Sequence, residues 1–151
     1  ASQNRPSIIF RLADFYLIYA EVANEVNPSD SRVLTYLNLV RERAGLPKVE
    51  ILNPGIVGNK ELQRAAIQRE RQIELATEGQ RYFDVRRWMI APQTESKTMH
   101  GIEITRATDG TKTWKEFDVR THVWRPAMYF FPIPYNETVK SKDLLQNPYY
   151  N

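Results

Sequence analysis

Apolar positions in the first part of the chain predict a long helix. From Arg11 to about Asn27, apolar residues recur at the i, i+3, i+4 and i+7 spacing of an α-helix. They occupy two sides: Leu12, Phe15, Tyr16, Tyr19, Ala20, Ala23 and Val26 on one, and Leu17, Ile18 and Val22 on the other. A narrow polar stripe remains at Asp14, Glu21 and Glu25. Because a helix that is apolar over most of its circumference packs on two sides, we expect neighbours on both.

A second helix follows Pro28, with its N-cap in residues 29–31 and its end at Gly45. Two antiparallel helices joined by a short turn make a unit of tetratricopeptide size. One such hairpin cannot bury both of its faces, so further helices are expected beside it. A third helix, from an N-cap at Asn59 to about Thr77, supplies one.

The second half of the chain changes to a strand pattern. Ile102 and Ile104 alternate with polar residues, and Asp109-Gly110 is typical of a hairpin turn. Residues 48–58 and 91–99 are expected to be loops.

The last part of the chain is punctuated by prolines and should run over the surface of a core and dock its aromatic residues there. The predicted fold class is therefore mainly α. It consists of a tetratricopeptide-like helical hairpin plus further helices, with a small β-hairpin and a proline-rich irregular C-terminal segment. We expect residues 1–151 to form a single domain.

The stretch from Glu70 to Trp88 mixes acids and arginines with apolar residues. Glu70, Glu74 and Glu78 share one face of a helix, where like charges repel by about 0.2–0.5 kcal/mol per pair. We therefore expect arginines of the same stretch to neutralise that face. The predicted structural ion network consists of Glu70, Arg71, Glu74, Glu78, Arg81, Asp84 and Arg87.

The same carboxylates could instead be the acid pair of a glycoside hydrolase. That chemistry needs two carboxyl groups across an open cleft, one of them with a raised pKa. Here an arginine lies within a few residues of each acid, and a neighbouring cation lowers the pKa of a carboxyl group. The pattern therefore favours a structural network, with no catalytic residue and no enzyme activity.

The amino-acid composition excludes several other kinds of binding or catalytic site. The net charge is +3 and most arginines lie beside acids, which argues against a dedicated nucleic-acid surface. The absence of cysteine excludes a disulfide, a thiolate metal site and a cysteine nucleophile. The two histidines, His100 and His122, lack the spacing of a metal site. We expect neither a metal nor a cofactor.

Five segments carry recognisable patterns. The stretch 70–88 reads E-R-x-x-E-L-x-x-E-G-x-R-x-F-D-V-x-R-W. It is preceded by a helix opening at 11–21 and by a helix with its stop at 37–47. It is followed by F-P-I-P-Y-N-E at 131–137 and L-Q-N-P-Y-Y at 145–150. In this order the segments resemble the SusD/RagB family, whose members are surface lipoproteins that capture nutrients for a TonB-dependent transporter in the outer membrane.

The resemblance implies that the chain is the C-terminal portion of such a protein and that the N-terminal portion is absent. It also implies an outer-membrane, cell-surface location through a lipid on a cysteine near the precursor's N-terminus. Because this chain has no cysteine and no signal peptide, the anchor is expected on the absent part. No apolar run approaches the roughly 20 residues that span a bilayer.

The function that the resemblance implies is non-enzymatic capture of an oligosaccharide and its delivery to a SusC-like transporter. Two other interpretations stay open. A member of the family could bind peptides or another non-sugar nutrient, and a helical-repeat scaffold could bind only protein.

Trp114 is the candidate carbohydrate-binding residue. Apolar sugar faces stack on aromatic rings, and this ring lies beside the predicted hairpin turn among polar neighbours. The other interpretation is a ring that packs as a satellite of the core. Trp88 and Trp124 are expected in the core. The resemblance implies that the main ligand contacts come from upstream loops.

Overall fold

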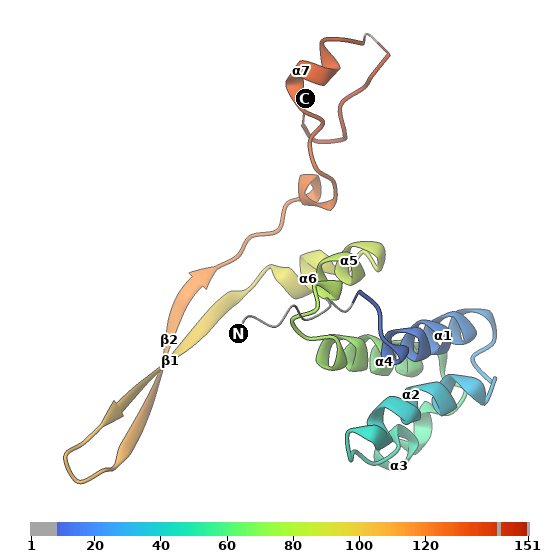
Figure 1. The fold of residues 1–151 in the computed structure, drawn as a ribbon, viewed down its shortest axis with the longest axis vertical. Helices are drawn as coiled ribbons and strands as arrows, with labels where there is room; N and C mark the ends of the chain where they lie inside the picture. The colour runs from blue at the N-terminus through green and yellow to red at the C-terminus, as the bar shows by residue number, and fades with distance from the viewer. Residues whose placement is uncertain (1–8, 142, 151) are drawn as a thin grey trace, which may run out of the picture. The chain divides into compact units, whose positions relative to one another are not determined.

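The computed structural model describes residues 9–141 and 143–150, in two compact units, Ala1–Tyr82 and Phe83–Asn151. The first unit holds α1 (Leu12–Val26), α2 (Arg32–Arg43), α3 (Val49–Leu52), the 3-10 helix η1 (Pro54–Ile56) and α4 (Lys60–Glu74) (Figure 1). The helix α5 (Gln80–Arg87) crosses the boundary. The second unit continues with α6 (Ala91–Glu95), β1 (Thr98–Arg106), β2 (Lys112–Thr121), η2 (Pro126–Tyr129) and α7 (Tyr135–Thr138). The mainly α fold class with one β-hairpin is confirmed, and the single domain stays a prediction.

Three helices of the first unit, α1, α2 and α4, share one apolar core. The side chains that form it are at most 2% exposed: Leu17, Ala20, Val33, Leu37, Val40 and Ile67. Within α1 and α2 these residues are three or four positions apart, which is the spacing of one helix face. Burying such side chains contributes about 1.5–3 kcal/mol for each large one. The predicted helical hairpin with a third helix beside it is therefore confirmed.

The opposite side of α1 stays exposed. Phe15 and Val22 are each 57% exposed, and Val26 is 81% exposed. Val22 lies seven residues, or two turns, after Phe15, and Val26 follows four residues later, so the three side chains form one apolar stripe along α1. The expected polar stripe was wrong at Asp14, which is only 4% exposed because its carboxylate binds Arg71 of α4.

The helix ends follow the local sequence with one exception, the end of α4. Asn59 caps α4 as predicted, since its Oδ1 accepts a hydrogen bond from the Leu62 N–H at 3.1 Å. The N-cap of α2 predicted within residues 29–31 is confirmed at Ser31, and Asp30 Oδ1 accepts the free N–H of Arg32 at 2.9 Å. The helix α4 ends at Glu74, earlier than expected, and Thr77 follows with a φ of 68°. Glu78 therefore lies outside the helix.

The predicted loop at 48–58 was wrong, because α3 and η1 lie within it. A side chain of α2 starts α3: Asn38 Oδ1 accepts a hydrogen bond from Val49 N–H at 3.0 Å, and Asn38 Nδ2 donates to Glu50 Oε2 at 2.8 Å. Ile56 of η1 is 2% exposed, so this segment also contributes to burial. The predicted loop at 91–99 was wrong for the same kind of reason, since α6 begins at the fully buried Ala91.

The second unit contains the predicted β-hairpin. The strands β1 and β2 pair antiparallel, with Arg106 opposite Lys112 and Ile104 opposite Trp114. The turn includes the expected Gly110, whose φ of 87° suits a residue without a Cβ. It spans five residues, closed by the Ala107 N–H to Thr111 carbonyl bond at 2.8 Å.

The C-terminal segment is held by polar side chains. The side-chain amide of Gln146 accepts a hydrogen bond from the Ile133 N–H at 2.7 Å and donates one to the Ile133 carbonyl at 2.8 Å. A neighbouring strand would pair with the backbone of Ile133 in the same way. The Tyr150 hydroxyl donates toward the carbonyls of Ala127 and Phe130, each at 3.0 Å. The expectation of docked aromatics was wrong for several rings: Phe130, Phe131 and Tyr135 are between 56% and 80% exposed.

Glu25 ties the end of α1 to the start of α4. Its carboxylate accepts hydrogen bonds from Arg64 Nε and Nη2, each at 2.7 Å, and lies 2.9 Å from Lys60 Nζ. The Arg64 guanidinium, followed by the Lys60 ammonium, lowers the pKa of Glu25 to about 2.

We expect this contact to be lost in acid. Because the pKa of Glu25 is lower in the folded chain than its ordinary 4.5, its stabilisation is present above pH 4.5 and is lost as the pH falls through about 2. The Tm of the protein and of Glu25→Gln should differ above pH 4.5 and converge toward pH 2. A difference in Tm that does not change with pH would contradict this.

Candidate functional site

Glu70 of α4 forms a nearly buried ion pair with α2. Its Oε2 lies 2.7 Å from Nη1 of Arg41, and the two side chains are 5% and 13% exposed. Arg41 also donates from Nε to the carbonyl of Pro47 at 3.0 Å. This arginine therefore joins α2, α4 and the segment after α2.

Glu74 and Glu78 share one arginine from the residue before α1. Arg11 binds the carboxylate of Glu74, and its Nε donates to Glu78 Oε1 at 2.9 Å. Arg43 of α2 adds a second contact to Glu74, at 2.6 Å from its Nη2. The hydrogen bond from Arg11 lowers the pKa of Glu78, and Glu78 and Glu74 together raise the pKa of Arg11.

The other members of the predicted network have contacts of their own. Arg71 of α4 pairs with Asp14 of α1 at 2.9 Å, with side chains 3% and 6% exposed. In α5, Asp84 is buried and accepts from Arg87 Nε at 3.0 Å. Arg81 also lies on α5, in its first turn.

The expected source of the cations was wrong. In the described part of the chain, the partners of Glu70, Glu74 and Glu78 come from positions 11, 41 and 43, not from the stretch 70–88. Sequence reasoning missed these arginines and Asp14. The one available signal was the Arg-Glu-Arg run at 41–43, which shares a helix with apolar residues facing the core. That the network is structural stays a prediction.

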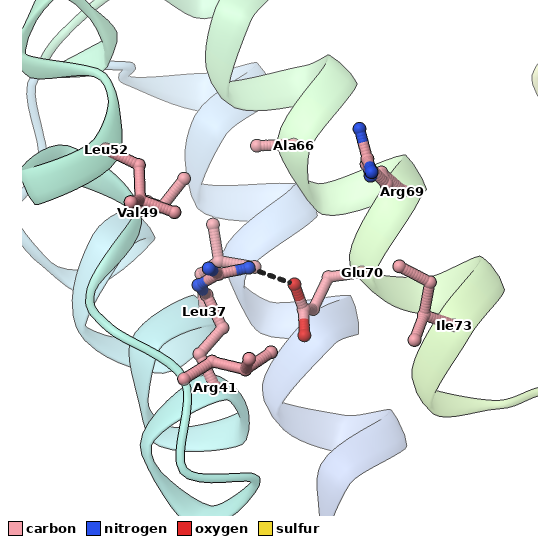
Figure 2. Close-up of a pocket in the computed structure, with 9 residues that line it drawn as sticks. Leu37, Arg41, Val49, Leu52, Ala66, Arg69, Glu70 and Ile73 are labelled. Carbon is pink, nitrogen blue, oxygen red and sulfur yellow. Dashed lines mark hydrogen bonds and ion pairs between the residues drawn. The ribbon is translucent and has the colours of Figure 1, made fainter.

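A cavity of about 370 Å³ lies between α2, α3 and α4 (Figure 2). In Figure 2 the side chains of Arg41 and Glu70 point toward each other across it. No aromatic ring lines the cavity, so it lacks the surface on which a sugar stacks. Besides Arg41, Glu70 and Arg69, its lining is apolar: Leu37, Leu46, Val49, Leu52, Ala66 and Ile73.

Trp114 lies on one face of the β-hairpin and is 65% exposed. Ile104 is directly opposite it, and Ile102 follows on the same face, 64% exposed. Glu116 is opposite Ile102. The ring therefore belongs to an exposed apolar patch that continues into polar groups.

Those polar groups form a small cluster next to the patch. His100 is opposite Asp118, and its Nδ1 lies 2.9 Å from Asp118 Oδ1 and 3.4 Å from Glu116 Oε1. All three side chains are at least half exposed. They can therefore both accept and donate hydrogen bonds to a ligand that rests on the ring. No metal-binding group of three or more such side chains occurs within residues 9–141 and 143–150.

The other two tryptophans are half-buried. The Arg87 guanidinium lies 4.5 Å from the centroid of the Trp88 ring. Trp124 packs edge-on against Tyr129, with ring centroids 5.1 Å apart, and has Arg86 5.0 Å away. Both rings serve packing within the second unit, which leaves Trp114 as the exposed tryptophan.

Comparison with known proteins shows to which family the sequence patterns of this chain belong. The model of the SusD family matches residues 1–150. The chain belongs to the SusD family. This confirms the resemblance that the segments 11–21, 37–47 and 70–88 indicated.

Individual relatives agree with this assignment. SusD-like protein P2 of Formosa agariphila is 31% identical over 144 residues, which cover 93% of this chain and 25% of that protein. SusD-like protein P25 of the same organism is 44% identical over 89 residues, covering 59% of this chain and 16% of that protein. A crystal structure of a SusD-like protein from Bacteroides fragilis matches with a TM-score of 0.81 at 35% identity, covering 95% of this chain and 26% of that one. The chain thus spans between 16% and 26% of the length of these relatives.

We expect Glu70→Ala to destabilise the protein strongly. The substitution leaves the Arg41 guanidinium, 13% exposed, without its carboxylate. Breaking a buried pair in this way costs about 3–5 kcal/mol. Urea denaturation would measure the loss. The matched control is Glu61→Ala in the same helix, where the side chain is 75% exposed and a change below about 0.5 kcal/mol is expected. Equal small losses in both variants would show that the pair is not structural.

Proposed function

We propose that this chain is part of a protein that captures oligosaccharides at the bacterial outer surface and delivers them to a SusC-like TonB-dependent transporter. Membership of the SusD family supports a role in nutrient binding. Among the described residues, none of the helices combines the length and apolarity needed to cross a bilayer. We propose that attachment to the outer membrane is through a lipid anchor elsewhere in the protein.

The observation that carries the sugar assignment is the exposed ring of Trp114 beside a polar cluster. Apolar C–H faces of sugars stack on an aromatic ring, and hydroxyls bind carboxylates and imidazole. Glu116 lies two residues from Trp114 on the same face, which is about 7 Å along a strand. A monosaccharide unit stacked on the ring therefore lies within reach of the carboxylate of Glu116.

Binding without catalysis is the second part of the proposal. Glycoside hydrolysis needs one carboxyl group with a raised pKa across a cleft from a second. In the predicted network each glutamate is instead engaged by an arginine, and the pKa of Glu78 is lowered by Arg11. The ion pairs thus support a structural role for these acids.

A second candidate function has its own observation. The exposed stripe of Phe15, Val22 and Val26 on α1 is a surface that a helical-repeat scaffold would use to bind protein. We propose instead that helices of the N-terminal portion of the same protein cover it. The short span of this chain relative to its relatives supports that assignment.

Calorimetric titration separates these functions. The protein is titrated with a panel of oligosaccharides and with a panel of peptides of similar mass. Heat with one or more glycans and none with peptides is expected. Peptide binding alone would favour the non-sugar nutrient, and binding to neither would favour the scaffold. A reducing-sugar assay on every glycan that binds checks the absence of turnover, and released reducing ends would reject the non-enzymatic proposal.

Trp114→Ala should weaken glycan binding several-fold, because a ring stack contributes on the order of 1 kcal/mol. The unfolding free energy of this variant should hardly differ from that of the unmodified protein, since the Trp114 side chain is 65% exposed. Phe117→Ala is the matched control: Phe117 belongs to the same strand but packs on Gly101, on the opposite face. A loss of about 3–5 kcal/mol in unfolding free energy for Trp114→Ala would mark the ring as core. Unchanged glycan affinity would remove Trp114 from the site.

A further inference from the structure

Two cations face each other at the tip end of the β-hairpin. Arg106, the last residue of β1, is the register partner of Lys112, the first residue of β2. Residues directly opposite in an antiparallel pair have Cβ atoms about 4.5–5.5 Å apart, and like charges there are destabilising. The hairpin therefore holds a concentrated positive charge that its own folding does not require.

No acid of the described chain neutralises this pair. Neither Arg106 nor Lys112 forms an ion pair within residues 9–141 and 143–150. The acid between the two cations in sequence, Asp109 of the turn, accepts the Thr111 N–H at 2.9 Å, and this bond lowers the pKa of Asp109. Its carboxylate is used to close the turn.

The cations lie on the same face as the exposed ring. The pair Ile104 and Trp114 is the next pair along that face after Arg106 and Lys112. Two residues along a strand correspond to about 7 Å, so the charges and the ring can contact one ligand together. The polar cluster around Glu116 lies on the far side of the ring, which leaves the side toward the tip positive.

We propose that this face of the hairpin binds a glycan that carries acidic groups, either carboxylate or sulfate, with one sugar ring on Trp114 and the anion between Arg106 and Lys112. A guanidinium binds such planar or tetrahedral oxyanions through two parallel hydrogen bonds, and an ammonium adds a point charge. The anion would also relieve the repulsion between the two cations. The inference rests on the proposed function, because it names the class of glycan for the same site.

An anionic membrane surface is the competing partner, since tryptophan with lysine and arginine is typical of membrane interfaces. Two features disfavour it. Glu116 and Asp118 lie on the same face and would be repelled by anionic lipid. The turn itself, residues 107–111, includes Asp109 and has no apolar side chain larger than that of Ala107, so the tip offers no large apolar group for insertion.

The test uses calorimetry on the protein with three oligosaccharides of equal length: galacturonate oligomers, the corresponding neutral galactose oligomers, and a sulfated galactose oligomer. One or both acidic oligomers should bind at least about ten-fold more tightly than the neutral one, a difference of about 1.4 kcal/mol. Which of the two binds more tightly distinguishes carboxylate from sulfate. In the double variant Arg106→Gln with Lys112→Gln the preference should disappear while neutral binding is retained.

The matched control is Lys115→Gln with Arg120→Gln, which removes the same charge from the opposite face of the hairpin. Lys115 is on that face by strand alternation, and Arg120 is on it because the register shift between Met99 and His100 pairs Arg120 with Met99. It should keep the preference for acidic glycans. Equal affinity for acidic and neutral oligomers, or an equal loss in both double variants, overturns the inference but not the proposed function. Binding to none of the three oligomers overturns the inference, and the wider glycan panel then decides the proposed function separately. Sedimentation with phosphatidylglycerol vesicles that depends on Arg106 and Lys112, without acidic-glycan binding, assigns the face to a membrane.

Discussion

We interpret the ion pairs made by charged side chains of α4 as the constraint on which the arrangement of the first unit depends. Arg71 binds Asp14 of α1, and Glu70 binds Arg41 of α2, both with almost no solvent exposure. Taking an ion out of water costs several kcal/mol, and only a well-placed partner offsets that cost. Burial of the apolar residues of the three helices stabilises the packed state, but it does not by itself specify how the helices are aligned. We interpret the ion pairs as the feature that selects one register among the packings that an apolar core would accept.

A different constraint shapes the β-hairpin. A two-stranded ribbon is marginally stable in water, so its few side-chain contacts matter. At Gly101 a Cβ would lie 2.7 Å from Cζ of Phe117, so glycine allows this ring to rest against the backbone of β1. Phe117 thus covers one face, and the opposite face is left to Trp114 and its neighbours. The ribbon presents an exposed surface rather than a core.

The sequence segments that indicated the family do not include the exposed hairpin that we propose as the ligand site. Arg11, Arg41 and the glutamates of α4 belong to the recognised segments, and in the structure they hold helices together. Gln146, in the last segment, clamps the backbone of Ile133. Trp114 and the two cations beside it lie between these segments. The segments that indicated the family thus contain ion pairs and polar contacts between elements, whereas Trp114 and the cation pair lie outside those segments.

Local sequence was enough for every element whose cause is local. The apolar spacing in α1 and α2, the cap at Asn59 and the turn at Gly110 each involve residues a few positions apart, and the structure contains all of them. For Trp114 the polar neighbours left an exposed ring and a packed ring both open, and the structure has the ring 65% exposed.

Tertiary contacts decided the rest. Spacing shows that α1 has two apolar sides but not which one meets α2 and α4, and Asp14 was misjudged for that reason. The partners of Glu70 and Glu74 are 29 to 63 residues away in the chain. The four-residue spacing of the glutamates indicates that cations are needed, but it does not identify which arginines supply them. The helix α3 begins because a side chain of α2 binds its first N–H group. The cation pair on the hairpin likewise required the strand register, since only pairing brings Arg106 and Lys112 together.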